Sequence, residues 1–342
     1  MPTNPGRDRA VMKSQKLVWL IVIPLMVLAL GVGILIIRSG WNKPQQPDAN
    51  DVIIVGFSQL GSESGWRVGN SKDVIRAAEE AGIELIYDNA AQKQENQINA
   101  LRSFIAYQVD VIALAPIVEE GWENVLTEAK NAGIPVLLCD RYINIHDEGL
   151  IAGYVGSDFM EEGRAAGQFL LKKAMDMDQV RIVEIAGTEG STPARQRALG
   201  FREVLQEDAR FDIIISVSGD FLRSKGKECM QNILAAHQDI HVLYSHNDAM
   251  TLGAIEAIEE AGLVPGQDII IITIDGEQGA IDLLKAGKIN CVVECTPLLG
   301  DLIMDLAQQL ARGEQIPAFS HPDEQVFTEF DAGLQAIPPR GY

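Results

Sequence analysis

The chain has 342 residues and carries 28 Lys and Arg against 48 Asp and Glu, a formal net charge of −20. This acidity argues against a nucleic-acid partner, because phosphate contacts require a basic surface. The length indicates two domains, and 47% hydrophobic residues with only four cysteines are typical of a globular protein rather than a low-complexity or disulfide-rich one.

The charge is distributed unevenly along the chain. Residues 1–50 carry six basic side chains against two acidic ones, so a basic leader precedes a strongly acidic body. Residues 17–37 (LVWLIVIPLMVLALGVGILII) hold no charged side chain and are long enough to cross a bilayer as a helix. The basic residues before this segment place the flank, residues 1–16, in the cytoplasm and the body outside the membrane, in the periplasm or at the cell surface.

Two interpretations of the apolar segment compete. A secretory signal peptide has a shorter apolar core and ends at an A-x-A-like cleavage site. Here the core is long, and Arg38 follows it without such a site. We therefore favour an uncleaved transmembrane signal anchor over residues 17–37. A polar tether over residues 38–51, with Pro44 and Pro47, would follow it.

Beyond the tether, apolar runs of strand length alternate with amphipathic helical patterns. The runs are continuously apolar, as expected of parallel strands that are buried on both faces. In residues 74–81, apolar side chains recur at helical spacing, and Gly82 follows as a helix stop. The same spacing recurs in residues 122–129, 198–205 and 254–261. The predicted strands are residues 52–58, 83–89, 109–116, 134–140, 180–187, 211–220, 240–248, 268–276 and 289–296.

This alternation predicts a doubly wound α/β fold. The strands are too many for one ordinary open sheet, and they divide near Gly153 into two comparable sets, which predicts two parallel-sheet lobes. In such lobes, ligands bind beyond the carboxyl ends of the strands. We therefore expect the strand ends of the two lobes to face one another across a cleft.

Polar side chains follow several of the predicted strands. Carboxylates, amides and guanidinium groups hydrogen-bond sugar hydroxyls, and the indole of tryptophan offers a flat apolar face to a sugar ring. This set suits a neutral polyhydroxylated ligand. The candidate runs at the strand ends are residues 58–67, 140–141, 195–197, 247–248 and 275–276.

Several candidates also have a purely structural interpretation. Asp140 and Arg141 could form a simple ion pair, and Trp66 could be a core residue. Asn247 and Asp275 could cap the helices that follow them, which is the common role of such residues. Their occurrence together at successive strand ends favours a binding site.

The sequence predicts no catalytic centre, no metal site and no cofactor. It lacks G-x-S-x-G, Walker and H-E-x-x-H motifs. A glycosidase that uses paired acids such as Asp140 and Asp275 stays an alternative. The four cysteines are expected to be buried free thiols, because four residues of extended strand hold Cys291 and Cys295 too far apart for a disulfide. The other two are Cys139 and Cys229.

Three motifs give the sequence a specific resemblance. GSESGWR (61–67), QKQENQI (92–98) and RSKGKE (223–228) are similar to motifs of the type I periplasmic sugar-binding proteins of ABC importers, the ribose- and galactose-binding group. HND (246–248) and IDG (274–276) also match and are more general to the fold. The resemblance covers nearly all of residues 52–297, although Gln196 stands where the family has an acidic residue before Arg197.

The resemblance implies the type I periplasmic binding protein fold, with two lobes joined by a three-strand hinge. The first lobe would hold residues 52–154 and about 297–327, and the second would hold residues 155–296 and about 328–342. The resemblance also implies which residues of the strand-end runs contact the sugar, and it adds Glu294, near a crossover strand. The contacts within the runs would be Ser58, Glu63, Trp66, Arg67, Asp140, Arg141, Arg197, Asn247 and Asp275.

The implied function is capture of a monosaccharide, galactofuranose or a related aldose, between the lobes. A monomeric, non-enzymatic binding protein would then deliver the sugar to the permease and ATPase subunits of an ABC importer. The alternative is a sensing module that presents the sugar to a chemoreceptor or a histidine kinase.

Overall fold

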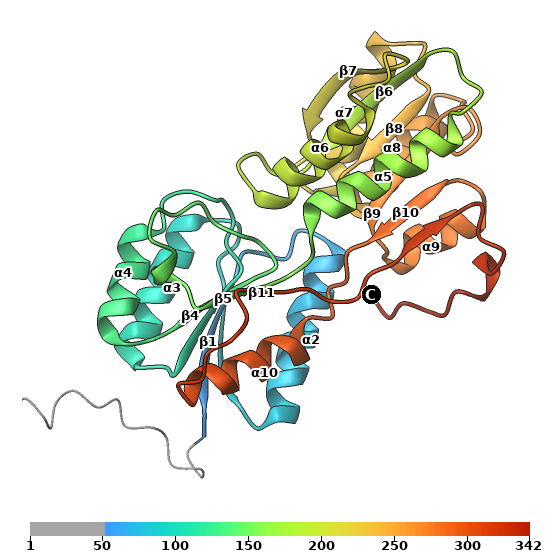
Figure 1. Ribbon diagram of the computed structural model, residues 1–342. Helices are drawn as coiled ribbons and strands as arrows, with labels where there is room; N and C mark the ends of the chain where they lie inside the picture. The colour runs from blue at the N-terminus through green and yellow to red at the C-terminus, as the bar shows by residue number, and fades with distance from the viewer. Residues whose placement is uncertain (1–51) are drawn as a thin grey trace, which may run out of the picture. The chain divides into compact units, whose positions relative to one another are not determined.

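The computed structural model describes residues 52–342, which form two α/β lobes, each built on a six-stranded sheet (Figure 1). The doubly wound architecture expected from the sequence is confirmed. The flank, anchor and tether predicted over residues 1–51 lie outside the described residues. Among the helices that are described, none combines the length and the apolar character needed to span a membrane.

The first lobe is built on a fully parallel sheet. Its strands are β1 (Ile54–Gln59), β2 (Glu84–Asn89), β3 (Val111–Leu114), β4 (Val136–Cys139), β5 (Gly153–Val155) and β11 (Phe319–Ser320). They pair in the order β11-β5-β4-β3-β1-β2. The register sets Gly56 of β1 opposite Ile86 on one side and Ile112 on the other. The carboxyl ends of the strands therefore lie along one edge of the sheet.

Helices cover both faces of this sheet, as Figure 1 shows. The four helices are α2 (Gly65–Ala81), α3 (Gln94–Tyr107), α4 (Glu123–Ala132) and α10 (Gly300–Ala311). On one face, α2 and α10 bury Val74 and Ile303 against Phe57 of β1. On the other face, α3 and α4 bury Phe104 and Leu126 against the strands. Burial on both faces explains why the strand sequences are continuously apolar.

The second lobe repeats the arrangement with one antiparallel strand. Its strands are β6 (Val180–Ala186), β7 (Phe211–Ser218), β8 (Val242–Ser245), β9 (Ile270–Asp275), β10 (Cys291–Glu294) and β12 (Val326–Thr328). They pair in the order β12-β10-β9-β8-β6-β7, and only β12 is antiparallel to its neighbour. The short strands β11 and β12 are not evident from the sequence.

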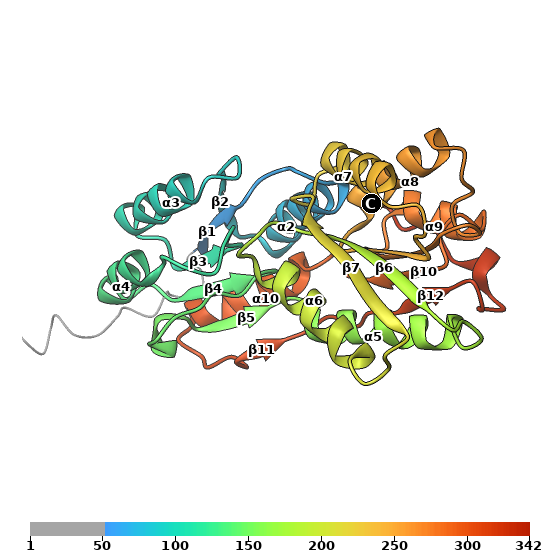
Figure 2. The ribbon, with the colours of Figure 1, turned by 90° about the horizontal axis from the view of Figure 1, so that it is seen from above.

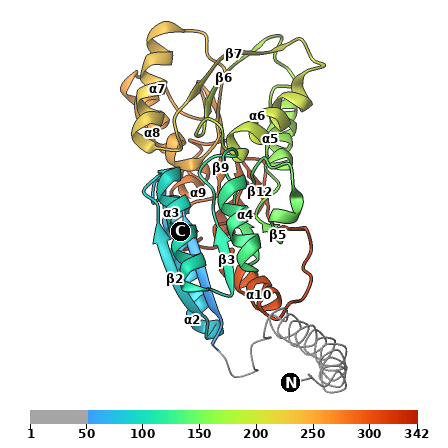
Figure 3. The same cartoon turned by 90° about the vertical axis from the view of Figure 1, so that its left-hand side faces the viewer.

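Helices also cover both faces of the second sheet. They are α5 (Phe159–Lys173), α6 (Thr192–Leu205), α7 (Arg223–Ala236), α8 (Asp248–Glu260) and α9 (Gln278–Lys285). Figure 3 shows α7 and α8 on one side of β6 and β7, and α5 and α6 on the other side. One core contains Met230, Leu243 and Ile258, and the other contains Phe169 and Phe201. In Figure 2, β6 and β7 lie side by side along the edge of this sheet.

The chain passes between the two sheets three times. The crossing segments, between β5 and α5, between β10 and α10, and between β11 and β12, are residues 156–158, 295–299 and 321–325. Because β12 already pairs with β10, the return to the second lobe comes before residue 326 rather than after residue 327. Likewise, Val155 pairs within the first sheet, one residue beyond the boundary expected from the sequence.

All four cysteines are free thiols, as expected. Cys139, Cys291 and Cys295 are buried, whereas Cys229 on α7 is only partly buried.

Candidate functional site

A pocket lies between the two lobes, at the carboxyl ends of both sheets. We call it the central pocket. Its lining includes eight of the ten residues that the sequence predicts for the site: Glu63, Trp66, Arg67, Asp140, Arg141, Arg197, Asn247 and Asp275. The sequence analysis missed Ser64, Phe159, Pro193, Phe221 and Cys295, which complete the lining.

Arg67 on α2 is the centre of a buried charge network in the first lobe. Its Nε donates to Glu63 Oε1 at 3.1 Å, and its Nη2 donates to Asp140 Oδ2 at 2.6 Å. The guanidinium is buried, and the two nearby carboxylates outweigh that burial and raise its pKa. Asp140 adopts a left-handed backbone conformation (φ 62°), which turns the chain directly after β4. The ion pair expected at this strand end is therefore real, but its principal cation is Arg67 rather than Arg141.

Arg141 lies beside this network without a full set of partners. Its Nη1 donates to the Ile117 carbonyl at 2.9 Å, whereas its Nε has no hydrogen-bond partner. Burial, together with the positive charge of Arg67, lowers the pKa of Arg141 to about 10. This guanidinium stays charged at neutral pH, so it offers an unused donor to a ligand.

Arg197 on α6 has the corresponding place in the second lobe. Its Nε donates to Glu162 Oε2 at 2.6 Å, and its Nη1 donates to the His246 carbonyl at 2.6 Å. The Asp275 carboxylate lies 3.9 Å from its Nη2, and burial raises the pKa of Asp275. These contacts hold Arg197 in one orientation at the pocket wall.

Asn247 combines both roles that its position suggested. Its Oδ1 accepts from the Met250 backbone N–H at 3.0 Å, which caps the start of α8, and its Nδ2 donates to the Phe221 carbonyl at 3.4 Å. The same side chain lines the pocket. A helix cap and a binding residue are therefore not exclusive here.

Aromatic rings form the apolar walls of the pocket. Trp66 is 4% exposed, and its Nε1 donates to the Cys295 carbonyl at 2.6 Å across the lobes. The guanidinium of Arg67 lies 4.5 Å from the Trp66 ring centre. Phe159 and Phe221 have the same relation to Arg197 and Arg141, at 5.1 and 5.2 Å. Each ring covers one face of a guanidinium group. The N–H donors at the edge of that group stay available for polar contacts.

Two predicted residues lie outside the lining. Ser58 is fully buried within β1, one residue before the strand ends, and its hydroxyl has no hydrogen-bond partner. Glu294 on β10 forms an ion pair with Arg340 of the C-terminal tail and accepts from the Gln325 N–H at 2.9 Å. The tail therefore pairs with the Glu294 carboxylate, which was predicted from the sequence to contact the ligand.

The fold and this pocket define a periplasmic binding protein of type I fold, and the chain belongs to that family. Residues 55–315 match the family model described as periplasmic binding protein domain. Members of the family are solute-binding components of transport systems rather than enzymes. The resemblance seen in the sequence motifs is thereby confirmed.

Particular relatives are similar over most of their length. The galactofuranose-binding protein YtfQ of Escherichia coli (strain K12) is 43% identical over 268 residues, which cover 78% of this chain and 84% of the relative. A structure from Mycobacterium smegmatis in complex with β-D-fucofuranose is 44% identical, with a TM-score of 0.81, and the match covers 83% of this chain and 93% of that one.

A further solved structure has the same degree of similarity. It is the binding protein of the arabinose ABC transporter of Shewanella sp. ANA-3, bound to α- and β-L-arabinofuranose. It is 44% identical, with a TM-score of 0.79, and the match covers 83% of this chain and 93% of the chain of that structure. The sugars bound in both structures are five-membered ring forms.

Proposed function

We propose that this protein binds a furanose sugar in the central pocket and delivers it to an ABC importer. The observation that carries the proposal is a set of three buried polar atoms without hydrogen-bond partners, Glu63 Oε2, Arg67 Nη1 and Arg141 Nε. All three belong to residues of the pocket lining. Buried polar groups are nearly always hydrogen-bonded, so this set indicates the place of a ligand that both donates and accepts. A neutral sugar does both through its hydroxyls.

The rest of the lining supports the same ligand. Asp140, Asn247 and Asp275 offer acceptors for hydroxyl protons, and the rings of Trp66 and Phe159 offer apolar surface to the C–H face of a sugar. The space left in the pocket is about 30 Å³, which is room for roughly one or two water molecules. A sugar therefore requires the lobes to separate before it enters.

Hydrogen bonds between the lobes stabilise the arrangement around the pocket. Thr192 Oγ1 on α6 donates to the Tyr142 carbonyl at 2.6 Å and accepts from the Tyr142 N–H at 3.1 Å. The backbone N–H of Trp66 donates to Glu277 Oε1 at 2.7 Å. We infer that the three crossing segments act as the hinge, and that bound sugar shifts the equilibrium toward a closed form that keeps these contacts between the lobes and leaves space for the sugar.

Thr192→Val tests the contribution of closure. The valine keeps the shape but removes both hydrogen bonds to Tyr142, each worth about 1 kcal/mol. We expect sugar affinity to fall about 5- to 30-fold and the dissociation rate to rise, measured by stopped-flow tryptophan fluorescence. Thr127→Val is the matched control, because Thr127 Oγ1 bonds only the Glu123 carbonyl within α4. Equal affinities of the two variants would contradict the closure model.

We further propose that residues 17–37 anchor the protein in the membrane and that the body acts as a monomer outside it. The proposal rests on the uncharged 21-residue run and its basic flank. Carbonate extraction of membranes from expressing cells should leave the full-length chain in the membrane fraction. Its release into the supernatant would contradict the anchor.

The sugar itself is tested by calorimetric titration with a panel of monosaccharides. We expect D-galactose, L-arabinose and D-fucose to bind through their minor furanose forms, and methyl furanosides to bind without that population penalty. Methyl pyranosides of the same sugars should not bind. Binding of the pyranosides alone would overturn the furanose assignment, and an inert panel would overturn sugar binding.

A further inference from the structure

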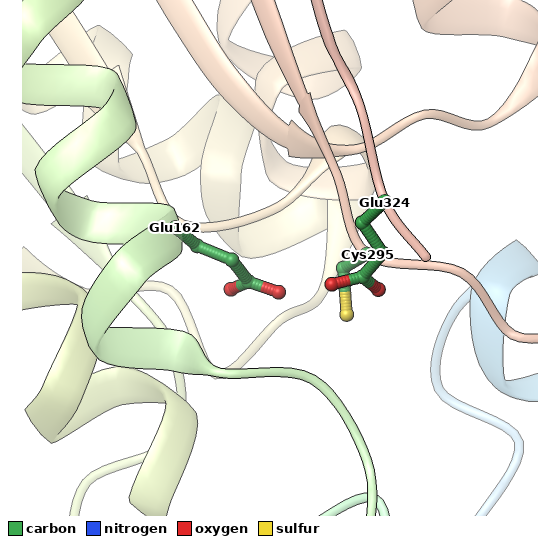
Figure 4. A group of neighbouring side chains, drawn as sticks. All are labelled: Glu162, Cys295 and Glu324. Carbon is green, nitrogen blue, oxygen red and sulfur yellow. The ribbon is translucent and has the colours of Figure 1, made fainter. Parts of the chain in front are cut away.

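Three side chains gather where the crossing segments meet, and the sugar site does not account for them as a group. Glu162 on α5, Cys295 in the second crossing and Glu324 in the third crossing each offer one ligand atom, all within 4.8 Å of one another. We call them the crossing cluster. Figure 4 shows the Glu162 carboxylate pointing toward Cys295 and Glu324. Glu162 and Cys295 are 4% and 2% exposed.

The two oxygens of Glu162 differ in their environment. Oε2 accepts from Arg197 at 2.6 Å, whereas Oε1 is buried and has no hydrogen-bond partner of normal geometry. A buried carboxylate oxygen without a partner is costly. Because the Glu162 carboxylate points into the cluster, where only the Cys295 thiol is close enough to donate to it, its second oxygen indicates a place for an electrophilic partner there.

A fourth donor atom lies next to the cluster. Ser157 Oγ, in the first crossing, is 2.6 Å from Glu324 Oε1 and 3.3 Å from Cys295 Sγ. The Thr296 N–H donates to the same Glu324 oxygen at 2.7 Å, which fixes the orientation of this carboxylate. Side chains from all three crossings and from α5 thus converge on one point.

We propose that Glu162, Cys295 and Glu324 bind a divalent cation of borderline softness, the class that Zn²⁺ represents, with Ser157 Oγ or water as the fourth ligand. A thiolate with two carboxylates suits such a cation and disfavours Mg²⁺ and Ca²⁺, which prefer oxygen alone. Ligand atoms on a tetrahedral Zn²⁺ lie roughly 3.3 to 3.8 Å apart, so the side chains need to contract by only about 1 Å. The cation would balance the negative charge of the two carboxylates. Arg197 alone does not balance it, because it pairs with Glu162 only.

The structure also provides an entrance for a cation. Glu162 and Glu324 line a pocket of about 230 Å³ that shares no lining residue with the central pocket. Cys295, by contrast, lines the central pocket, and its carbonyl accepts from the Trp66 indole. A cation at the cluster would therefore restrain the same peptide that holds Trp66.

The test is a calorimetric titration of chelator-treated, full-length protein with ZnCl₂ in the absence of sugar. We expect one equivalent of Zn²⁺ per chain, and at least tenfold weaker binding in Cys295→Ser and in Glu324→Gln. Cys229→Ser is the matched control, because its thiol lies on α7 outside the cluster, and it should bind like the wild type. No stoichiometric binding, or unchanged binding in both cluster variants, would overturn the proposal.

A spectroscopic measurement covers the case that a cluster variant does not fold. Co²⁺ bound to a thiolate gives a sulfur-to-metal charge-transfer band in the near ultraviolet. In Cys229→Ser protein, whose thiols outside the cluster are buried, one equivalent of Co²⁺ should produce this band. Its absence would refute a thiolate ligand. Because no sugar is present, this outcome is separate from the fate of the proposed transport function.

Discussion

Arg67→Met should lower sugar affinity at least about 100-fold, a loss of about 2.7 kcal/mol of binding free energy. Methionine fills similar space but removes the unpartnered Nη1 and the donors that position Glu63 and Asp140. Those carboxylates would then lie close together and without a cation at the pocket wall. Calorimetric titration with the best sugar of the panel measures the effect.

The same substitution should also reduce stability. Removing one partner of a buried ion pair commonly costs about 3 to 5 kcal/mol, because the remaining charge stays buried and unpaired. The control is Arg102→Met, since Arg102 pairs with Glu128 at the exposed surface of α3. We expect this control to bind sugar within twofold of the wild type. A folded Arg67→Met protein with affinity within threefold of the wild type would refute the assigned role of Arg67.

Gly200→Val should produce the second large effect, a loss of about 3 kcal/mol of stability or more. A Cβ at Gly200 of α6 would collide with the Met160 carbonyl of α5, which is backbone and cannot rotate away. The two helices would have to separate, at the cost typical of overpacked cores. Because Arg197 and Glu162 lie on these helices, their ion pair and sugar binding should weaken too.

Thermal unfolding measures this effect. We expect the Tm to fall by about 5 to 10 °C, in proportion to the lost free energy. Gly333→Val is the control, since a Cβ there meets no atom within 4 Å and its backbone φ is −94°. Its Tm should change by less than about 2 °C. A Tm of Gly200→Val equal to that of the control would show that the helix contact is not as close as described.

The fold could be predicted from the sequence because burial on both faces leaves continuous apolar runs in parallel strands. The edge strands show the limit of this signal. Residues 211–218 are as apolar as a central strand, yet they form β7 at the edge of the sheet and are only partly buried. The strands β11 and β12 have only two and three residues, too few for any periodicity.

The site was predictable where it lies at strand ends and obscure where it depends on the crossings. Asp140 and Asn247 lie within two residues of the ends of β4 and β8, and Asp275 is the last residue of β9, so topology alone places them. Phe159 and Cys295 reach the pocket through the path of the crossing segments, which no local pattern encodes. Phe221 lies close to the end of β7, where ligand-binding residues are expected. It was missed because only polar side chains and tryptophan were considered at the strand ends.

Long-range contacts explain the remaining differences. Glu294 forms an ion pair with Arg340 of the C-terminal tail. The two residues are far apart in the sequence, so no local pattern predicts this contact. The crossing cluster escapes notice for the same reason, since its members are widely separated in the chain and lack the short spacing of familiar zinc motifs.

A co-crystal structure with a methyl furanoside that binds in the titration tests the central claim most directly. We expect the sugar in the central pocket, with its hydroxyls within hydrogen-bond distance of Glu63 Oε2, Arg67 Nη1 and Arg141 Nε, and its ring against Trp66 or Phe159. A sugar bound elsewhere, or bound in the pocket with those three atoms still unpartnered, would contradict the proposed site.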